Sequence, residues 1–285
     1  MGIVNTDIVE DNFAKRNSSS YDLSILVGMD RFSYVIVNGD KQLLALKSYL
    51  LNADLDTSQP LQPALQAIFL EDKKLKLSYR NTYVGVVNSQ STFVPNRFFQ
   101  AADASVYLKN QCTTSEEHQI FIDELQAVDA KNVYTFDREV FYLVKGFLPS
   151  ARFFHNTTSL LQGFMKNQNG NNEKNVYVNV KGDHLQIALL EGKNLIFFNA
   201  YSYQTEHDFI YHVMLIYDQF NLSPENTPIY VSGQLTKDSK LFRIMYRFIK
   251  DVSLLKIPTT VFFGKNAEGI PPHFYFDLFS LELCG

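Results

Sequence analysis

The sequence has little cysteine, no tryptophan and no long apolar run. Its two cysteines, Cys112 and Cys284, lie far apart and neither belongs to a Cys-x-x-Cys pair, which excludes a disulfide framework and a zinc knuckle. Charged or amide residues interrupt every apolar run well short of the roughly 20 residues that cross a bilayer, and residues 1–20 lack the apolar stretch of a signal peptide. We therefore expect reduced thiols and a cytoplasmic protein without a transmembrane segment.

An excess of charge of one sign is also missing. The chain carries 26 Lys and Arg against 30 Asp and Glu, with the two signs interspersed, so the net charge is only −4. Such a chain has no strong field to hold nucleic acid or an anionic membrane. The six histidines show no metal-ligand spacing, and neither a Gly-x-Ser-x-Gly elbow nor a Walker loop occurs. Neither a nucleic-acid partner nor a bound metal is predicted.

What the sequence does contain is enough apolar surface for one large core or two medium ones: 46% of its 285 residues are hydrophobic, including 24 Phe and 16 Tyr. Residues 1–20 are polar and are predicted to be a flexible N-terminal tail. A second polar stretch, 167–174, is rich in turn-forming Asn and Gly. We place a lobe boundary there, which gives a first lobe over 21–170 and a second over 171–285.

An internal repeat links the two lobes. Residues 23–49 and 176–201 each contain three apolar runs separated by two tight turns. Aligning Asp30 with Asp183 also aligns Gly39 with Gly192, since each glycine lies nine residues downstream of its aspartate. Each segment therefore predicts three antiparallel strands, with a glycine at each turn supplying the positive φ of a two-residue hairpin.

Helices are expected after each strand trio. In the second copy, apolar residues recur at helical spacing from Phe209 to Phe220, and Thr205 stands three residues before Asp208 as the start of a capping box. In the first copy, the counterpart runs from Leu61 to Phe69, with Pro60 and Pro63 at its beginning, where a missing N–H costs little.

A strand–helix–strand unit is predicted further along each copy. Such a unit implies a right-handed parallel crossover, so each half is expected to be a five-stranded mixed sheet with helices. Residues 82–87 are expected to form a strand in inserted material of the first copy, and the tail from His273 to Leu283 a closing strand or a short packed helix. The crossover units comprise strand 132–136, helix 140–147 and strand 151–155 in the first copy, and strand 228–232, helix 241–249 and strand 254–258 in the second.

This α/β arrangement, repeated twice, resembles the duplicated ribonuclease-H-like (actin-like ATPase) fold shared by actin, heat-shock chaperones and sugar kinases. The phrases Asn199-Ala200-Tyr201, Tyr230-Val231-Ser232-Gly233 and Phe276-Asp277-Leu278-Phe279 are similar to those of an uncharacterised bacterial family, a domain of unknown function with an actin-like fold. From Tyr21 to Gly285 the chain is identified as a member of that family. The resemblance implies the fold and little chemistry, because a fold does not determine a function.

The resemblance also implies where a nucleotide would bind, because members of this superfamily hold phosphates between the lobes on two glycine-rich hairpins. The first hairpin matches Leu26 to Phe32, with an apolar residue where an Asp belongs. The second matches Asn179 to His184, with Asn in place of the carboxylate and Lys in place of the first glycine. An adenosine-side motif is partly matched by Ile229 to Gln234. The resulting interlobe cofactor-binding candidates are Gly28, Asp30, Lys181, Gly182, Asp183 and Gly233.

Loss of carboxylates from both core strands removes the hard-oxygen ligands of magnesium, on which phosphoryl transfer depends. We therefore predict a degenerate nucleotide site, no bound cofactor and no catalysis. The favoured hypothesis is a non-catalytic scaffold or regulator that binds a protein partner or associates with itself.

Two alternatives remain open at this stage. One is an ATP-dependent enzyme or switch of the same fold, whose altered loops use Asp30, Lys181 and Asp183 with ATP and magnesium as cofactors. The other is a cytoplasmic platform that associates with membranes, as some bacterial division and secretion proteins of this fold do.

Overall fold

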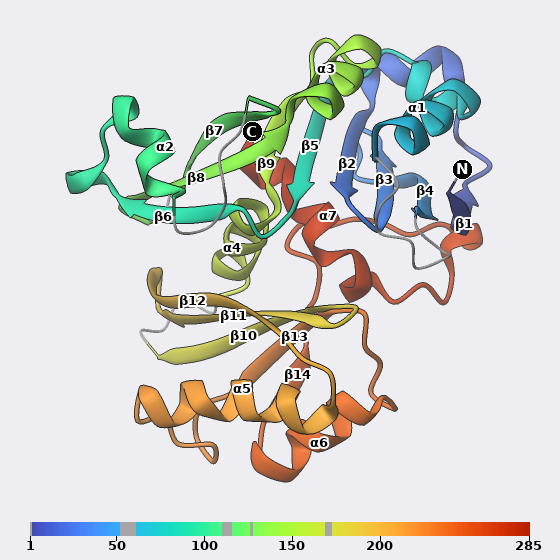
Figure 1. Cartoon of the computed structure of the whole chain (residues 1–285). Coiled ribbons are helices and arrows are strands. Elements are labelled where there is room, and N and C mark those ends of the chain that lie inside the picture. Colours follow the sequence, from blue (N-terminus) through green and yellow to red (C-terminus); the bar gives the residue numbers. More distant parts are fainter. Residues whose placement is uncertain (1, 52–60, 110–115, 126–127, 169–172) are drawn as a thin grey trace. The chain divides into compact units, whose positions relative to one another are not determined.

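The chain forms two compact units, each built around its own sheet (Figure 1). Unit 1 comprises Met1–Leu160, Thr259–Ile270 and Leu278–Gly285, and unit 2 comprises Leu161–Pro258 and Pro271–Asp277. The boundary thus falls inside helix α4 (Asn156–Lys166), before the predicted position, and the C-terminal region is divided between the units. The computed structural model describes residues 2–51, 61–109, 116–125, 128–168 and 173–285. Cys112, Pro60 and the middle of the predicted linker lie outside these residues.

Unit 1 contains a six-stranded mixed sheet in the order β1-β4-β3-β2-β5-β9. The predicted trio forms two antiparallel hairpins, and β2 and β5, like β5 and β9, pair in parallel. Almost every residue of β2, β3 and β5 is buried, because both faces of these strands are covered. The strands are β1 (Ile3–Val9), β2 (Asp22–Gly28), β3 (Arg31–Val37), β4 (Leu43–Leu50), β5 (Asn81–Val87) and β9 (Arg152–His155).

The prediction of a flexible tail over residues 1–20 was wrong. Residues 3–9 form β1, which pairs antiparallel with β4, and Lys15–Ser20 form the 3-10 helix η1. β1 is an edge strand with mostly exposed side chains, and its Ile and Val residues are separated by Asn5, Thr6 and Asp7, so it lacks a continuous apolar run although its backbone pairs with β4. The stabilising partner lies some forty residues away in sequence, where composition gives no sign of it.

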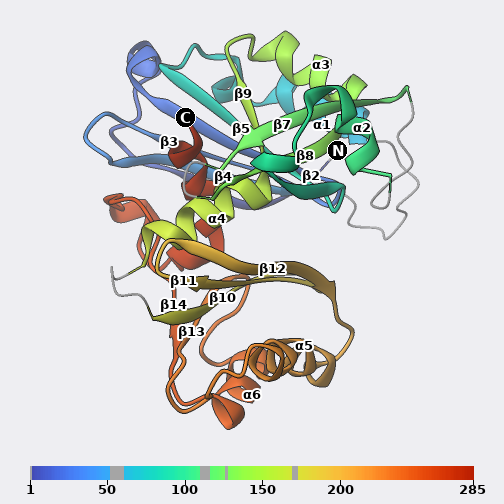
Figure 2. The same cartoon turned by 90° about the vertical axis from the view of Figure 1, so that its left-hand side faces the viewer.

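The strand at 132–136 was predicted to be the first-copy counterpart of β13 (Ile229–Gly233), and this prediction was also wrong. Strand β5, assigned to an insertion, is the parallel neighbour of β2. The strand at 132–136 instead belongs to a separate antiparallel sheet of order β6-β8-β7, whose strands are labelled in Figure 1 and whose β7 and β8 are seen from another side in Figure 2. An apolar run shows that a strand is buried but not which strand it pairs with. This sheet consists of β6 (Ser91–Pro95), β7 (His118–Glu124) and β8 (Ala130–Asp137).

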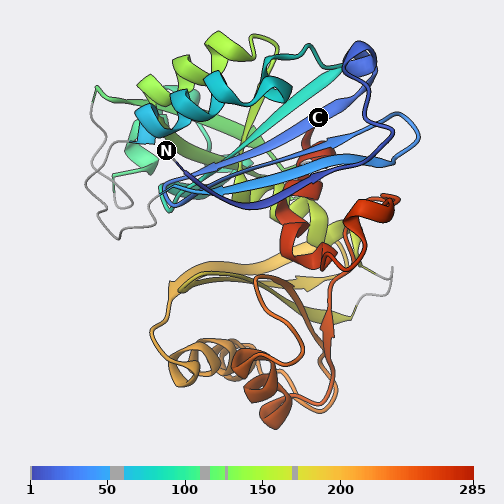
Figure 3. The same ribbon diagram turned by 90° about the vertical axis from the view of Figure 1, so that its right-hand side faces the viewer.

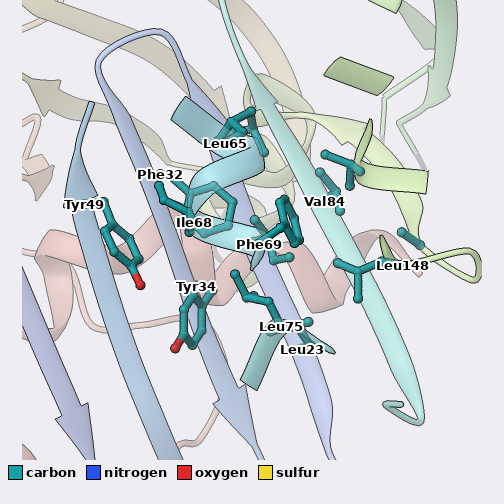
Figure 4. Packing of buried hydrophobic residues seen from close by; sticks show 14 of the residues in the cluster. Leu23, Phe32, Tyr34, Tyr49, Leu65, Ile68, Phe69, Leu75, Val84 and Leu148 are labelled. Atoms are coloured by element: carbon teal, nitrogen blue, oxygen red, sulfur yellow. The ribbon is translucent and has the colours of Figure 1, made fainter. Parts of the chain in front are cut away.

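Helices α1 (Leu61–Glu71) and α3 (Arg138–Phe147) confirm the predicted helices of the first copy. They cover one face of the six-stranded sheet and bury their apolar residues against it (Figure 3). Phe69 of α1 lies between the ring of Phe32, at 5.7 Å, and the ring of Phe147, at 4.9 Å. In Figure 4, Tyr34 and Tyr49 turn their rings toward this core and carry their hydroxyl groups at its margin. Short elements connect the parts of unit 1: η2 (Lys73–Lys76), η3 (Asn96–Phe98), η4 (Ala101–Asp103), α2 (Ala104–Tyr107) and η5 (Lys265–Ala267).

Unit 2 follows the predicted order of elements. Its five-stranded mixed sheet has the order β12-β11-β10-β13-β14, and its two helices, α5 and α6, lie on one face of that sheet (Figure 1). The capping box at Thr205 and Asp208 is present. β14 begins two residues before the predicted start of that strand. The elements are β10 (Lys174–Lys181), β11 (His184–Glu191), β12 (Asn194–Ser202), α5 (Glu206–Gln219), β13 (Ile229–Gly233), α6 (Lys240–Phe248) and β14 (Val252–Leu254).

Turn chemistry matches the prediction in the second copy only. Gly182 and Gly192 both adopt a φ of +56°, whereas Gly39 does not adopt a positive φ. In the first copy, Asn38 accepts hydrogen bonds from the backbone N–H groups of Asp40 and Gln42, and Lys41 takes the left-handed position with a φ of 61°. The Asn side chain organises this turn, so glycine is not needed for it.

The C-terminal tail is helical, which confirms one of the two predicted alternatives. It consists of η6 (Pro272–Tyr275), α7 (Phe276–Ser280) and η7 (Leu281–Cys284). Phe279 and Leu281 are buried in unit 1. Cys284 is a free thiol whose pKa is raised by burial.

Candidate functional site

The first predicted phosphate hairpin is the β2–β3 turn of unit 1. Leu26 stands where a carboxylate was sought, and it is 5% exposed. It lies in register between Ser33 of β3 and Gly85 of β5. A Cβ atom on Gly85 would come within 2.6 Å of Leu26 Cδ2 and 2.9 Å of Leu281 Cδ2. The leucine side chain therefore fills the space above a strand glycine and acts as a core residue.

The turn of this hairpin is open to solvent. Met29 is 56% exposed, and the carbonyl oxygen of Asp30 accepts a hydrogen bond of 2.8 Å from the N–H of Leu51. Gly28 pairs with Val87 of β5 and does not adopt a positive φ. The surviving glycine of this loop is thus not required by the backbone conformation.

The second predicted phosphate hairpin is the β10–β11 turn of unit 2. Asn179, 1% exposed, lies in register between Gln186 and Ser232. Its Nδ2 donates to Gln186 Oε1 at 3.2 Å, and its Oδ1 accepts from Ser232 Oγ at 3.0 Å. The amide that replaces a carboxylate is therefore held by hydrogen bonds to both neighbouring strands.

Lys181, at the end of β10, is ion-paired through Nζ with Asp277 Oδ2. The carboxylate is almost fully buried, with 1% of its side chain exposed, while 26% of the lysine side chain is exposed. Asp277 belongs to the C-terminal segment 271–277, which is part of unit 2. Within this segment the ring of Phe276 stacks on Phe164 at 5.5 Å, and His273 Nε2 lies 2.8 Å from the carbonyl oxygen of Leu235.

The turn after Lys181 is fixed from a second side by Tyr203. The Tyr203 hydroxyl donates to the carbonyl oxygen of Gly182 at 2.6 Å, and its backbone N–H donates to the carbonyl oxygen of Asp183 at 2.8 Å. The Asp183 carboxylate lies 2.6 Å from His184 Nδ1 on the surface. Lys181, Gly182 and Asp183 thus form one turn whose conformation is held by contacts to Tyr203, directly after β12, and to the C-terminal segment.

Gly233, at the end of β13, is the glycine whose conformation is most tightly required. Its φ is +91°, and a Cβ atom there would lie 2.0 Å from the carbonyl oxygen of Val180. The next residue, Gln234, donates its N–H to that same oxygen at 2.7 Å. Among the predicted candidates, unit 2 therefore brings together Lys181, Gly182, Asp183 and Gly233, while Gly28 and Asp30 belong to unit 1.

A buried polar cluster in unit 1 escaped the sequence analysis. Asp123 of β7, 5% exposed, accepts hydrogen bonds of 2.7 Å from the N–H of His155 and from Thr158 Oγ1. Burial raises the pKa of Asp123 to about 6 and lowers that of His155 to about 4. Asn132 of β8 adds a hydrogen bond to the same threonine. The cluster ties the start of α4 to the three-stranded sheet, and the polar run 156–159 is the signal that marks this helix start.

The described part of the chain shows no group of three or more His, Cys, Asp or Glu residues placed to hold a metal ion. Nor does any of its helices have the length and apolar character needed to cross a membrane.

Comparison of the sequence with protein families gives one match, to the family described as "Protein of unknown function (DUF3822)", over residues 10–252. The chain belongs to the DUF3822 family. The match covers the six-stranded sheet from β2 onward and almost the whole of the five-stranded sheet. No match to a curated protein was found.

Solved structures place this DUF3822 protein in the actin-like ATPase fold. A Bacteroides thetaiotaomicron protein with an actin-like ATPase fold and unknown function is 22% identical, with a TM-score of 0.75 over 85% of this chain and 93% of its own. The PilM-PilN type IV pilus biogenesis complex matches at 12% identity and a TM-score of 0.61 over 92% and 97%. The ethanolamine utilization protein EutJ from Carboxydothermus hydrogenoformans matches at 12% identity and a TM-score of 0.50 over 98% and 93%.

These likenesses confirm the predicted actin-like fold, and the family match confirms the predicted family. The two mixed sheets are consistent with the predicted duplication, although the sheet of unit 1 has six strands where five were predicted. Identities this low establish the fold alone, so the chemistry rests on the residues of this chain.

Proposed function

We propose that this DUF3822 protein is a non-catalytic scaffold or regulatory interaction protein whose actin-like nucleotide site has degenerated. The observation that carries the proposal is the ion pair between Lys181 and the buried Asp277 carboxylate. The resemblance puts a phosphate-binding glycine where Lys181 stands. An anion at this turn would meet an ammonium group that is already neutralised and a fixed negative charge beside it, which disfavours phosphate.

The two core-strand positions support the same conclusion. Magnesium prefers carboxylate oxygens and water as ligands, and phosphoryl transfer depends on metal and positioning. Leu26 offers no ligand atom, and the amide of Asn179 is bound to Gln186 and Ser232. Each position is adapted to packing within its own sheet.

A role in protein interaction fits a body of this fold that lacks the nucleotide chemistry. The PilM-PilN complex is an instance of a similar fold in a complex involved in type IV pilus biogenesis. The partner of the present chain, another protein or a second copy of itself, is to be sought on surfaces other than the two hairpins.

Calorimetric titration of the full chain with ATP and magnesium tests the proposal. We expect no binding heat beyond dilution up to millimolar nucleotide, and no ATP hydrolysis above that of the Gly28→Ala, Asp183→Asn variant. Micromolar binding, or hydrolysis that this loop variant abolishes, would overturn the proposal and establish the alternative of an ATP-binding enzyme or switch.

A second variant, Lys181→Gly with Asp277→Asn, sharpens the result. It removes both charges of the pair and returns a glycine to the turn. If this variant gains nucleotide binding that the natural chain lacks, the Lys181–Asp277 pair is the cause of the loss. If neither binds, the positions of Leu26 and Asn179 suffice to explain it.

A further inference from the structure

β1 is one edge strand of the six-stranded sheet. Within the described residues β1 pairs only with β4, and Ile3 and Val4 are 57% and 45% exposed. At the far end of the strand, Asn266 of η5 donates its Nδ2 to the carbonyl oxygen of Val9 at 2.9 Å and covers that end. An exposed edge strand offers backbone donors and acceptors to an added strand.

A cavity of about 480 Å³ opens beside this edge. Its apolar lining comes from Val4 and Val9 of β1, from Phe13, and from Tyr49 of β4. Val4 and Tyr49 are direct partners in the β1–β4 pairing, so the cavity lies along one face of the edge pair. A strand added to β1 would direct every second side chain toward that face.

Three lysines surround the apolar lining. Lys15 follows β1 along the chain, and Lys73 and Lys74 begin η2. Across the described residues, none of the three forms an ion pair with a carboxylate. Against them stands the single exposed carboxylate of Glu71. The rim is therefore positive on a chain whose net charge is −4.

The charged groups deeper in the cavity are paired with one another. Lys47 Nζ lies 2.9 Å from Asp7 Oδ2 and 3.4 Å from Asp72 Oδ2. Asp72 also accepts hydrogen bonds from the hydroxyl groups of Tyr34, at 2.7 Å, and Tyr49, at 2.9 Å. Burial by itself would raise the pKa of Asp72, but the hydrogen bonds from Tyr34 and the Lys74 N–H outweigh it and lower that pKa. The floor is thus a fixed network with one more carboxylate than lysine, and the rim lysines are the positive charges available to a partner.

We propose that the β1 edge and its cavity bind an extended acidic segment of a partner protein, in which Glu or Asp alternates with apolar residues. The segment adds to β1 as a strand, its apolar side chains enter the cavity, and its carboxylates meet Lys15, Lys73 and Lys74. This inference rests on the proposed interaction function and gives its partner a chemistry.

Fluorescence anisotropy with labelled nine-residue peptides tests the inference on the full chain. The probe alternates Glu and Val, one comparison peptide alternates Lys and Val, and another has the same Glu and Val content in two blocks. We expect the alternating acidic peptide to bind at least about tenfold more tightly than either comparison peptide, because only it satisfies both the charge and the period of the site. Equal binding of the Lys–Val peptide or of the block peptide contradicts the proposal.

The variant Lys15→Glu, Lys73→Glu, Lys74→Glu should weaken binding of the acidic peptide by about tenfold or more, as expected for three exposed charge pairs. A matched control, Lys193→Glu, Lys237→Glu, Lys240→Glu, makes the same change of net charge on exposed lysines of unit 2 and should bind like the natural chain. If the first variant does not fold, the Lys→Gln set at the same positions replaces it. Unchanged affinity of the rim variant, or an equal loss in the control, overturns the proposal.

Hydrogen exchange locates the peptide. Bound peptide should slow exchange of the amides in residues 3–8, and protection confined to another strand contradicts the assignment. Co-sedimentation with phosphatidylserine and phosphatidylcholine vesicles tests whether the rim lysines bind an anionic lipid surface. Vesicle binding that depends on the rim lysines, without peptide binding, would make this a lipid site and overturn the proposal.

The nucleotide titration separates the two proposals. If both the peptide and ATP bind, the proposed degenerate nucleotide site is contradicted and the β1 proposal is supported. If neither the peptide nor ATP binds, only the β1 proposal is contradicted.

Discussion

Leu26 of unit 1 and Asn179 of unit 2 occupy matching places in two sheets, and each is buried by a different means. Each precedes its turn aspartate by four residues and lies between an antiparallel and a parallel neighbour. Leu26 fills the space above Gly85, whereas Asn179 is hydrogen-bonded to Gln186 and Ser232. The two places share the same strand pairing but differ in the side chains around them, because a buried amide needs polar partners and a buried leucine needs room.

The two turns that follow also differ. The β2–β3 turn leaves Met29 exposed, while the β10–β11 turn is held by Tyr203 and by the pair between Lys181 and Asp277. In unit 2 the strand-end glycine Gly233 lies against the backbone of the turn strand, at the register position where unit 1 has Val86. The second copy is thus the more tightly specified of the two, and three experiments test that difference.

Gly233→Ala should have the largest effect. Its Cβ would lie 2.0 Å from the Val180 carbonyl oxygen, and its φ of +91° is unfavourable to any L side chain. We expect a loss of about 4 kcal/mol or more in the stability of unit 2, measured by chemical denaturation followed through unit 2 amide exchange. Gly146→Ala is the control: a Cβ there meets nothing within 4 Å, and its position in α3 favours alanine. A loss at Gly233 no larger than at Gly146 would refute the tight fit.

Exchanging the two core-strand residues tests the comparison directly. Leu26→Asn should destabilise unit 1 by about 3 kcal/mol, because it removes packing above Gly85 and buries an amide among apolar atoms. Asn179→Leu should cost unit 2 about 1 to 2 kcal/mol, since Ser232 keeps its hydrogen bond to the Val178 carbonyl oxygen. Thermal unfolding of both variants measures the costs. If Leu26→Asn is tolerated without loss, the site in unit 1 is more polar than its contacts indicate.

Lys181→Met should have a smaller effect than Leu26→Asn, about 2 kcal/mol, because the lysine is partly exposed although its partner Asp277 is buried. Adding Asp277→Asn should recover part of the loss, since the uncompensated buried charge is then gone. Denaturant midpoints of the single and double variants give the coupling between the two residues. A double variant less stable than the sum of the two single changes would contradict a simple charge pair.

Local pattern predicted the elements of unit 2 almost completely. Helical spacing and the capping box gave α5, and the paired runs gave β10, β11 and β12. These signals act between near neighbours in the chain, where propensity and periodicity apply. The same rules gave α1 and α3 in unit 1.

These rules did not predict which strands pair when the strands lie far apart in the sequence. β1 was predicted as a tail, and the roles of β5 and β8 were exchanged. The residue types of a segment do not show which strand it pairs with. The six predicted site residues remain a prediction as a nucleotide site. Asp277 appeared only within a family phrase, and nothing in its neighbourhood along the chain pointed to Lys181, 96 residues earlier.

The sequence by itself determined the repeat and the helices and strands of the second copy, since each is a matter of residue type and spacing, while the missing carboxylates at Leu26 and Asn179 follow from the family resemblance. Only the tertiary structure decided that β1 closes one edge of the sheet, that β5 rather than β8 neighbours β2, and that Lys181 is neutralised by Asp277. These outcomes depend on contacts between residues distant along the chain, whose free energy exists only once both partners are in place.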